Sequence, residues 1–561
     1  MKPACLLFLL IPAACFIISC TGKANAPSPA LVKELSLKKG APISCGPADQ
    51  QLGTVVFKIT GSESANNSFR LGLKLLHSFE YDEAEKVFAD IIDKEPECIM
   101  AYWGVAMSSF HALWAPPSEP ELKKGSGAVS IARSLARAGS REGDYVEAIA
   151  AFYTGWDSIG HRDRCIRFEK AMEALHTRYP DDKEAAIFYA LALNAAADPA
   201  DRSFYKQKKA GNILDAIYPG EPDHPGIVHY IIHTYDLPEL ATMALPAARK
   251  YASIAPSSAH ALHMPSHIFT RLGLWDECIS SNLASMTSAQ CYAQQAGIQG
   301  HWDEELHAMD YLMYAYLQKG DNDLARKQLD YLRTIGAVHP ANFKVAYAFA
   351  SVPSRYVLEN KSWKEAAALQ LHAASFDWKE FPWQKAIFQF ARLMGAVHTG
   401  NTAAAKTELK ELKLLHQALL EQKDAYKAAQ VEIQINTSEA WIKLKNNQVE
   451  EALALMKMAA NQEDRTEKHP VTPAEVIPAR ELLGDMLLEA RLYNEALGAY
   501  EANLRKHPNR FNGLYGAGLA AEKAGDLQKA TVYYKTLLRI SGHGTNARPE
   551  IQYIKRFLKE S

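Results

Sequence analysis

The feature that most constrains the fold of this chain is a spacing of small, aromatic and proline residues that recurs along it. Near the C-terminus the offsets 0, 1, 13, 17 and 25 hold Leu483, Gly484, Ala496, Tyr500 and Pro508. The same offsets recur at Ala517-Gly518, Ala530 and Tyr534, and at Leu71-Gly72, Ala84, Phe88 and Pro96. Small residues let two helices cross closely and the aromatic fills the gap to the next pair, so the spacing predicts stacked helix pairs.

This 34-residue register resembles the tetratricopeptide repeat (TPR) family. The resemblance implies an all-α chain that forms an α-solenoid of helix-turn-helix repeats. Turn signals before amphipathic segments continue the pattern at 320–325, 362–366 and 447–452. We therefore expect an N-terminal TPR-like solenoid over residues 65–345 and a C-terminal one over residues 346–561, with a proline-rich loop at 114–120.

The N-terminal segment has the pattern of a targeting signal. Lys2 precedes an apolar run from Pro3 to Ser19, which is too short for a spanning helix. The run ends in Ile17-Ile18-Ser19-Cys20, which resembles the bacterial lipobox. The resemblance implies a lipoprotein signal peptide over residues 1–19, lipidation at Cys20 and a membrane anchor without a transmembrane helix.

The residue after Cys20 is Thr21, and no acidic run follows, which favours an outer-membrane lipoprotein on the periplasmic side. Small, polar and proline residues predict a short flexible tether over residues 20–45. An ordinary secretory signal that happens to contain a cysteine is the alternative.

Five cysteines remain beyond the signal, at positions 45, 98, 165, 278 and 291. They are far apart and form no CxxC, which argues against a zinc knuckle. An odd number in an oxidising compartment leaves at least one thiol unpaired. Cys278 and Cys291 are close enough in sequence to pair, but the sequence does not decide the pairing.

The middle of the chain is rich in histidine: eight of the 19 lie between residues 224 and 307. They fall in three segments, 224–236, 260–273 and 301–314, each expected to be the first helix of a repeat. Aligning Gly273 with Gly320 superposes the three polar positions of the second segment on those of the third. Spacings of three, four and seven residues place such side chains on one helix face, so neighbouring first helices would present them together on the concave surface.

Imidazoles from adjacent helices are suitable ligands for Zn, Cu or Fe. The candidate ligands are His229, His233, His263, His267, His307 and Asp310. Further ligands or supporting partners are His260, His224, His301, Asp236, Asp303, Glu304, His111 and Tyr314. The set fits one closed site or two metals that share ligands. A polar peptide-binding groove and plain structural histidines are the alternatives.

This region also resembles a group of largely uncharacterised bacterial TPR lipoproteins with a His-rich centre. The similarity rests on Tyr102–Met107 with His111 and Trp114, on His229–His233 and on His260–His267. It covers roughly residues 65–340 and implies a shared fold and histidine pattern, without a reaction.

Charge balance and motif content argue against several classes of function. There are 62 basic and 64 acidic residues, so no excess positive charge favours nucleic acid as a partner. The sequence has no glycine-rich phosphate loop, which argues against a nucleotide cofactor, and neither HExxH nor GxSxG.

We expect a membrane-anchored scaffold that binds a protein or peptide partner and carries a transition metal on its inner face. The alternative is a mononuclear or dinuclear metal-dependent oxidase or hydrolase. Metal storage or delivery is a third, and the sequence leaves open whether the protein is an enzyme.

Overall fold

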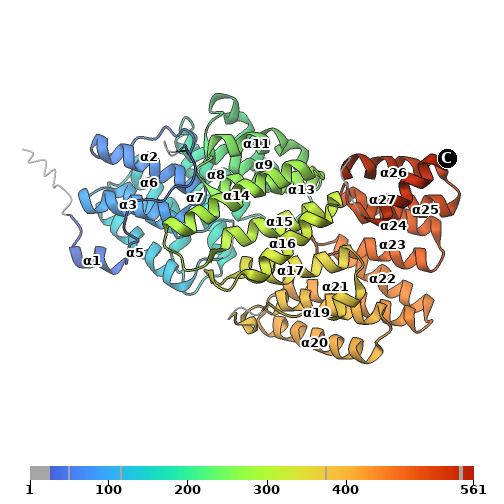
Figure 1. Ribbon diagram of the computed structural model, residues 1–561. Helices are drawn as coiled ribbons and strands as arrows, with labels where there is room; N and C mark the ends of the chain where they lie inside the picture. Colours follow the sequence, from blue (N-terminus) through green and yellow to red (C-terminus); the bar gives the residue numbers. More distant parts are fainter. Residues whose placement is uncertain (1–25, 48–50, 114–115, 373–375, 543–547, 561) are drawn as a thin grey trace, which may run out of the picture.

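The computed structural model describes residues 26–47, 51–113, 116–372, 376–542 and 548–560 (Figure 1). The described chain is almost entirely α-helical, with most helices packed against their neighbours in sequence, which confirms the all-α prediction. The signal peptide, Cys20 and the start of the tether lie outside the described residues, as does Trp114.

The N-terminal helices are α1 (Pro29–Glu34), α2 (Glu63–His77), α3 (Tyr81–Lys94), α4 (Ile99–Ser108), α5 (Glu119–Leu135), α6 (Arg141–Tyr153), α7 (His161–Arg178), α8 (Lys183–Ala195), α9 (Tyr205–Ile217) and the 3-10 helix η1 (Tyr218–Gly220). The central helices are α10 (Pro225–Tyr235), α11 (Ala241–Ile254), α12 (Ala259–His263), α13 (Pro265–Leu272), α14 (Trp275–Gln295), α15 (Asp303–Lys319), α16 (Asn322–Thr334) and α17 (Phe343–Glu359). The C-terminal helices are α18 (Trp363–Ala367), η2 (Trp378–Glu380), α19 (Pro382–His398), α20 (Thr402–Glu421), α21 (Ala425–Lys445), α22 (Val449–Asp464), α23 (Ala479–Glu489), α24 (Tyr493–Lys506), α25 (Phe511–Ala524), α26 (Leu527–Ser541) and α27 (Pro549–Glu560).

Two short strands interrupt the helical pattern. β1 (His301–Trp302) pairs in parallel with β2 (Val338–His339), with His301 opposite Val338. The sequence analysis placed His301 in a first helix, whereas the helix begins two residues later, at Asp303.

The small residues of the repeat register lie where an aromatic ring fills the space between helices. A Cβ added at Gly484 would approach the Tyr500 ring to 2.7 Å, and one at Gly516, in the next helix pair, to 2.3 Å. At the other end of the chain, a Cβ at Gly72 or Gly104 would come within 2.6 Å of Phe88. Each ring thus packs against the helix before it and the helix after it, as the spacing predicts.

The segment expected as a flexible tether, residues 20–45, differs from that prediction over residues 29–45. It contains α1, buries Leu35 in the core, and its Lys38 and Ile43 N–H groups donate to the carboxylates of Glu85 and Glu83 on α3. A disulfide joins Cys45 to Cys291 on α14. The pairing of Cys278 with Cys291 therefore does not form, and Cys98, Cys165 and Cys278 are buried free thiols.

The C-terminal helices lie at the right-hand end of the molecule in Figure 1, where α25 and α26 pack against α15. Arg510, just before α25, is fully buried and donates to the carboxylates of Glu359 on α17 and Glu481 on α23, and to the Tyr314 hydroxyl on α15. The backbone N–H of Phe511 donates to Gln318. The last repeats are thus fixed to the central helices by buried polar contacts.

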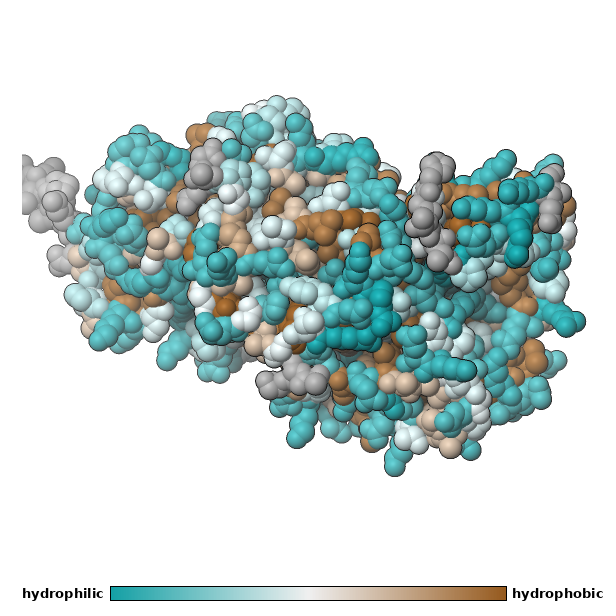
Figure 2. All heavy atoms as spheres, viewed as in Figure 1, coloured by the Kyte–Doolittle hydropathy of each residue, from teal (hydrophilic) through white to brown (hydrophobic). Residues whose placement is uncertain are grey.

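None of the described helices is both long and apolar enough to cross a bilayer. The face shown in Figure 2 is mostly hydrophilic, with hydrophobic side chains in small patches. Such scattered apolar side chains are usual on a folded surface.

We expect Gly516→Val to lower the free energy of unfolding by about 1–3 kcal/mol, because its side chain would overlap the Tyr500 ring. Gly498→Ala is the matched control, since Gly498 lies within α24 and a Cβ there meets open space. Alanine favours a helix by up to about 1 kcal/mol over glycine, so the control should be neutral or more stable. Urea unfolding of both variants measures the difference, and equal stabilities would contradict the packing described.

Candidate metal centre

The histidine-rich helices α10, α12, α13 and α15 meet in the interior of the central region. The single helix expected over 260–273 is broken, because α12 ends at His263 and α13 starts at Pro265. Proline cannot donate the backbone hydrogen bond that a continuous helix needs at that position. His260 and His263, on the short α12, serve two different groups.

The first group consists of His229, His233 and His260. The Nε2 atom of His229 lies 3.1 Å from Nε2 of His233 and 3.1 Å from Nε2 of His260. The Nδ1 atom of His229 lies 2.6 Å from the carbonyl oxygen of His77, which can only accept, so Nδ1 carries the hydrogen. Nε2 of His229 therefore presents a lone pair to the centre of the group.

The second group consists of His263, His267 and His307. Nε2 of His263 lies 3.2 Å from Nε2 of His267, and the His263 and His307 ring centroids are 4.2 Å apart. His263 donates from Nδ1 to the Asn282 side-chain oxygen, at 2.7 Å, since the amide nitrogen of Asn282 donates to the Cys278 carbonyl. His267 donates from Nδ1 to the Asp236 carboxylate, at 3.1 Å.

Both groups have the spacing and orientation of metal ligands. In each, the candidate ligand atoms of the three histidines lie within 4.8 Å of one another. Ligands on a tetrahedral metal at 2.0–2.1 Å stand about 3.3 Å apart, close to the Nε2 separations observed. Hydrogen bonds from the other ring nitrogen orient metal-binding imidazoles, as they do here for His229, His263 and His267. Two buried triads that could bind a metal thus lie side by side, with the His233 and His267 ring centroids 6.3 Å apart.

A third cluster, His77, Glu184 and His224, has similar spacing but a different proton arrangement. Nδ1 of His224 accepts the Ile227 N–H at the start of α10, so its hydrogen is on Nε2, which donates to Glu184 at 2.9 Å. Nε2 of His77 lies 3.0 Å from the other carboxylate oxygen. Although burial opposes it, His77 and His224 hold the pKa of Glu184 well below its usual range. This cluster is a satisfied hydrogen-bond network rather than a metal site.

Burial keeps the six imidazoles of the two triads neutral, which is the form that binds a metal. It lowers the pKa of His229 to about 3. Burial also lowers the pKa of the other five imidazoles, and Asp236 opposes this effect at His233 and His267. The five are His233, His260, His263, His267 and His307.

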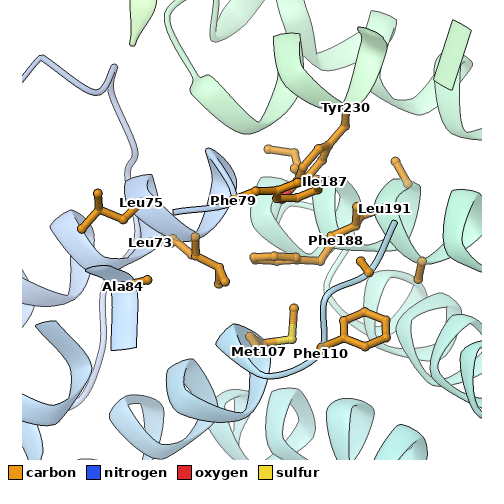
Figure 3. Close-up of a cluster of buried hydrophobic side chains, with 14 of the residues drawn as sticks. Leu73, Leu75, Phe79, Ala84, Met107, Phe110, Ile187, Phe188, Leu191 and Tyr230 are labelled. Carbon is orange, nitrogen blue, oxygen red and sulfur yellow. The ribbon is translucent and has the colours of Figure 1, made fainter. Parts of the chain in front are cut away.

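Aromatic rings enclose both triads. Phe79, which follows α2, has its ring centroid 4.3 Å from that of His229, and Tyr251 lies 5.1 Å from the same imidazole. Figure 3 shows Phe79 beside Tyr230 of α10 in this apolar core. Beside the second triad, the Tyr311 hydroxyl lies 3.3 Å from Nε2 of His267. The apolar enclosure strengthens electrostatic interactions within the site.

Asp236 lies at the boundary between this site and a cavity of about 400 Å³. Its carboxylate accepts hydrogen bonds from His267, from Arg271 at 2.8 Å and from Lys468 at 3.0 Å. Lys468 is on the segment between α22 and α23, so the C-terminal half contributes to the site. His233 is the triad histidine that lines the cavity.

Several residues proposed from the sequence lie elsewhere. Asp310 is not part of either triad: its carboxylate accepts from Ser351 at 2.6 Å and is 3.3 Å from Arg355. Tyr314 contacts Arg510. The other four candidates also have partners outside the triads. His301 bonds Glu305, and Asp303 and Glu304 pair with Lys344. His111 packs on Tyr81 and lies near Glu121.

Sequence reasoning missed three residues of this region. His77 and Glu184 lie on α2 and α8, far from the histidine-rich segment, and nothing in their local spacing marks them. The alignment of the second and third histidine segments picks out Asp310, whereas the residue that contacts the second triad is its neighbour Tyr311. His260, treated only as an additional ligand, is a full member of the first triad.

Comparison with known proteins identifies the repeats at the C-terminal end. Residues 482–544 match the tetratricopeptide repeat family model, which confirms the TPR register predicted there. No curated protein matches the chain.

Several solved structures align with this chain over most of its length. A human IFIT1 dimer with m7Gppp-AAAA is 11% identical over 83% of this chain and 95% of its own, with a TM-score of 0.33. The P58(IPK) TPR domain is 13% identical over 89% and 99%, with a TM-score of 0.20. The Cut9–Hcn1 hetero-tetramer of the APC/C is 11% identical over 89% and 97%, with a TM-score of 0.26. At these TM-scores we draw no functional argument from them.

We expect Glu184→Ala to lower the free energy of unfolding by about 3–5 kcal/mol, because it leaves two buried imidazoles without their shared acceptor. Glu221→Ala is the control, since Glu221 pairs with an exposed lysine, Lys183, and its loss should cost less than about 1 kcal/mol. Thermal and urea unfolding of both variants test this. Similar losses in the two would contradict the structural role of the cluster.

Proposed function

We propose that this protein is a helical-repeat scaffold that binds two transition-metal ions, one in each histidine triad. The observation that carries the proposal is the direction of the Nδ1 hydrogens. His229, His263 and His267 each donate from Nδ1 to a carbonyl, an amide oxygen or a carboxylate, so Nε2 of each is unprotonated and can bind a metal. Purely structural histidines need no such shared orientation. Imidazole ligation favours Zn, Cu or Fe.

Metal analysis of untagged protein tests the proposal. We expect about two equivalents in the wild type, and the loss of one equivalent in His229→Gln/His233→Gln and in His263→Gln/His267→Gln. His224→Gln is the control, because His224 belongs to the hydrogen-bonded cluster and should leave the metal content unchanged. Wild-type protein that takes up no Zn, Cu or Fe on reconstitution would refute the proposal.

A metal-dependent oxidase or hydrolase is the second candidate function. The observation that favours it is the cavity beside His233, which would give a small molecule access to the first triad. A storage or delivery site needs no such cavity, and a catalytic metal keeps an open position.

We also propose that the chain is an outer-membrane lipoprotein facing the periplasm, anchored at Cys20. The support is the sequence of residues 1–20, and the Cys45–Cys291 disulfide is compatible with an oxidising compartment. Its repeats would offer a surface to a protein or peptide partner, the usual role of such arrays.

The anchor is tested by expressing the full chain in a Gram-negative host with a labelled fatty acid. We expect label in the wild type and recovery in the outer-membrane fraction. Cys20→Ser should carry no label, whereas Cys15→Ser, within the apolar run, should still be labelled. Label that survives in Cys20→Ser would contradict lipidation at this residue.

A further inference from the structure

The cavity beside the first triad has the size and lining of a small-molecule site. Its volume of about 400 Å³ lies within the range of roughly 300–1,000 Å³ typical of ligand pockets. Its apolar lining includes Leu113, Phe204 and Pro470. Its polar lining includes His233 and the groups around Asp236.

The charged lining of the cavity consists of four carboxylates and two basic groups: Asp198, Asp201, Asp236, Glu467, Arg271 and Lys468. Arg271 and Lys468 both contact the single carboxylate of Asp236. The neighbouring Glu467 pairs with Arg202 at 2.6 Å and lies 3.8 Å from Arg271. The other two carboxylates are held elsewhere, since Asp198 pairs with Arg162 and Asp201 accepts from the Ser203 hydroxyl. Lys468 and Arg271 are thus the basic groups that line the cavity, both beside Asp236.

The Lys468 ammonium also has N–H groups that Asp236 does not accept from. Its buried ammonium has three N–H groups, and Asp236 takes one of them. Within the described residues no second acceptor lies at hydrogen-bond distance. A buried donor without an acceptor is unfavourable, so an anionic ligand would satisfy this group.

A metal ion bound to the first triad would also favour the binding of an anion in the cavity. Three imidazoles leave a fourth coordination position, whereas structural zinc sites use four protein ligands. Neutral imidazoles also leave the full charge of the ion uncompensated in a buried site. His229 and His260 are shielded from solvent, and His233 faces the cavity, so an incoming ligand would approach from that side.

We propose that this cavity binds a small organic anion, whose carboxylate or similar oxygen group contacts Lys468 and completes the coordination of the metal on the first triad. The apolar wall accommodates the body of the molecule. This inference rests on the proposed function, because it needs a metal at His229, His233 and His260.

Anion titration of the copper(II)-loaded protein tests the inference. Azide gives a charge-transfer absorption band when it binds an open copper position, and acetate serves as a competing carboxylate. We expect a saturable azide band that acetate suppresses. Lys468→Met should weaken both anions roughly tenfold to a hundredfold, the range of a lost charged hydrogen bond.

Two variants on α9 test the route. Gln207 lines the cavity, so Gln207→Trp should obstruct it and weaken both anions. Lys208→Trp, at the exposed neighbouring position, should leave their affinities unchanged. Copper content and thermal unfolding, measured on every variant, verify that each retains its fold and its metal.

Each result decides a separate point. Copper-loaded protein that gives no azide band would overturn the inference and leave the proposed metal sites standing. Equal azide affinities in the wild type, Lys468→Met and Gln207→Trp would overturn the role of the cavity. A wild type that binds no copper, zinc or iron would overturn the proposed function and this inference together.

Discussion

The centre of the molecule depends on one buried carboxylate, that of Asp236. It accepts from His267 of the second triad, from Arg271 on α13 and from Lys468 of the C-terminal half. Lys468 and Arg271 hold its pKa well below the usual range in spite of burial. Removing this carboxylate would leave Lys468 without its partner, Arg271 with only Glu467 at 3.8 Å, and the His267 imidazole without the acceptor of its Nδ1 hydrogen. One of the contacts between the two halves of the chain and the orientation of His267 in the second triad therefore depend on the same carboxylate.

Proton positions distinguish the three clusters better than distances do. All three bring nitrogen or oxygen atoms within 4.8 Å of one another. In the two triads, backbone or side-chain acceptors hold the Nδ1 hydrogens of His229, His263 and His267, so their Nε2 lone pairs face the other imidazoles. At His224 a backbone N–H occupies Nδ1 instead, which places the hydrogen between imidazole and carboxylate. Similar residue types thus form an arrangement that could bind a metal in one case and a structural network in the other.

The sequence predicts what depends on local spacing. The glycine and aromatic positions around Tyr500 and Phe88 follow from the repeat, and the histidine faces of α10 and α13 follow from helical periodicity. It does not predict contacts between distant segments. The spacing of Asp310 from His307 predicts a metal ligand, but its carboxylate pairs with Arg355, 45 residues later in the chain. Cys45 looked like part of a tether because nothing nearby shows that it bonds Cys291.

The bond between Cys45 and Cys291 spans 246 residues and turns the first part of the array into a closed ring. An open repeat array frays from its ends, because a terminal repeat has a neighbour on one side only. The N-terminal repeats of this chain cannot peel away singly, since their outer end is joined covalently to α14 in the middle. A repeat gained or lost inside the ring would separate the two cysteines. The disulfide thus constrains the number of repeats between Cys45 and Cys291. No disulfide constrains the number of repeats in the described C-terminal part of the chain.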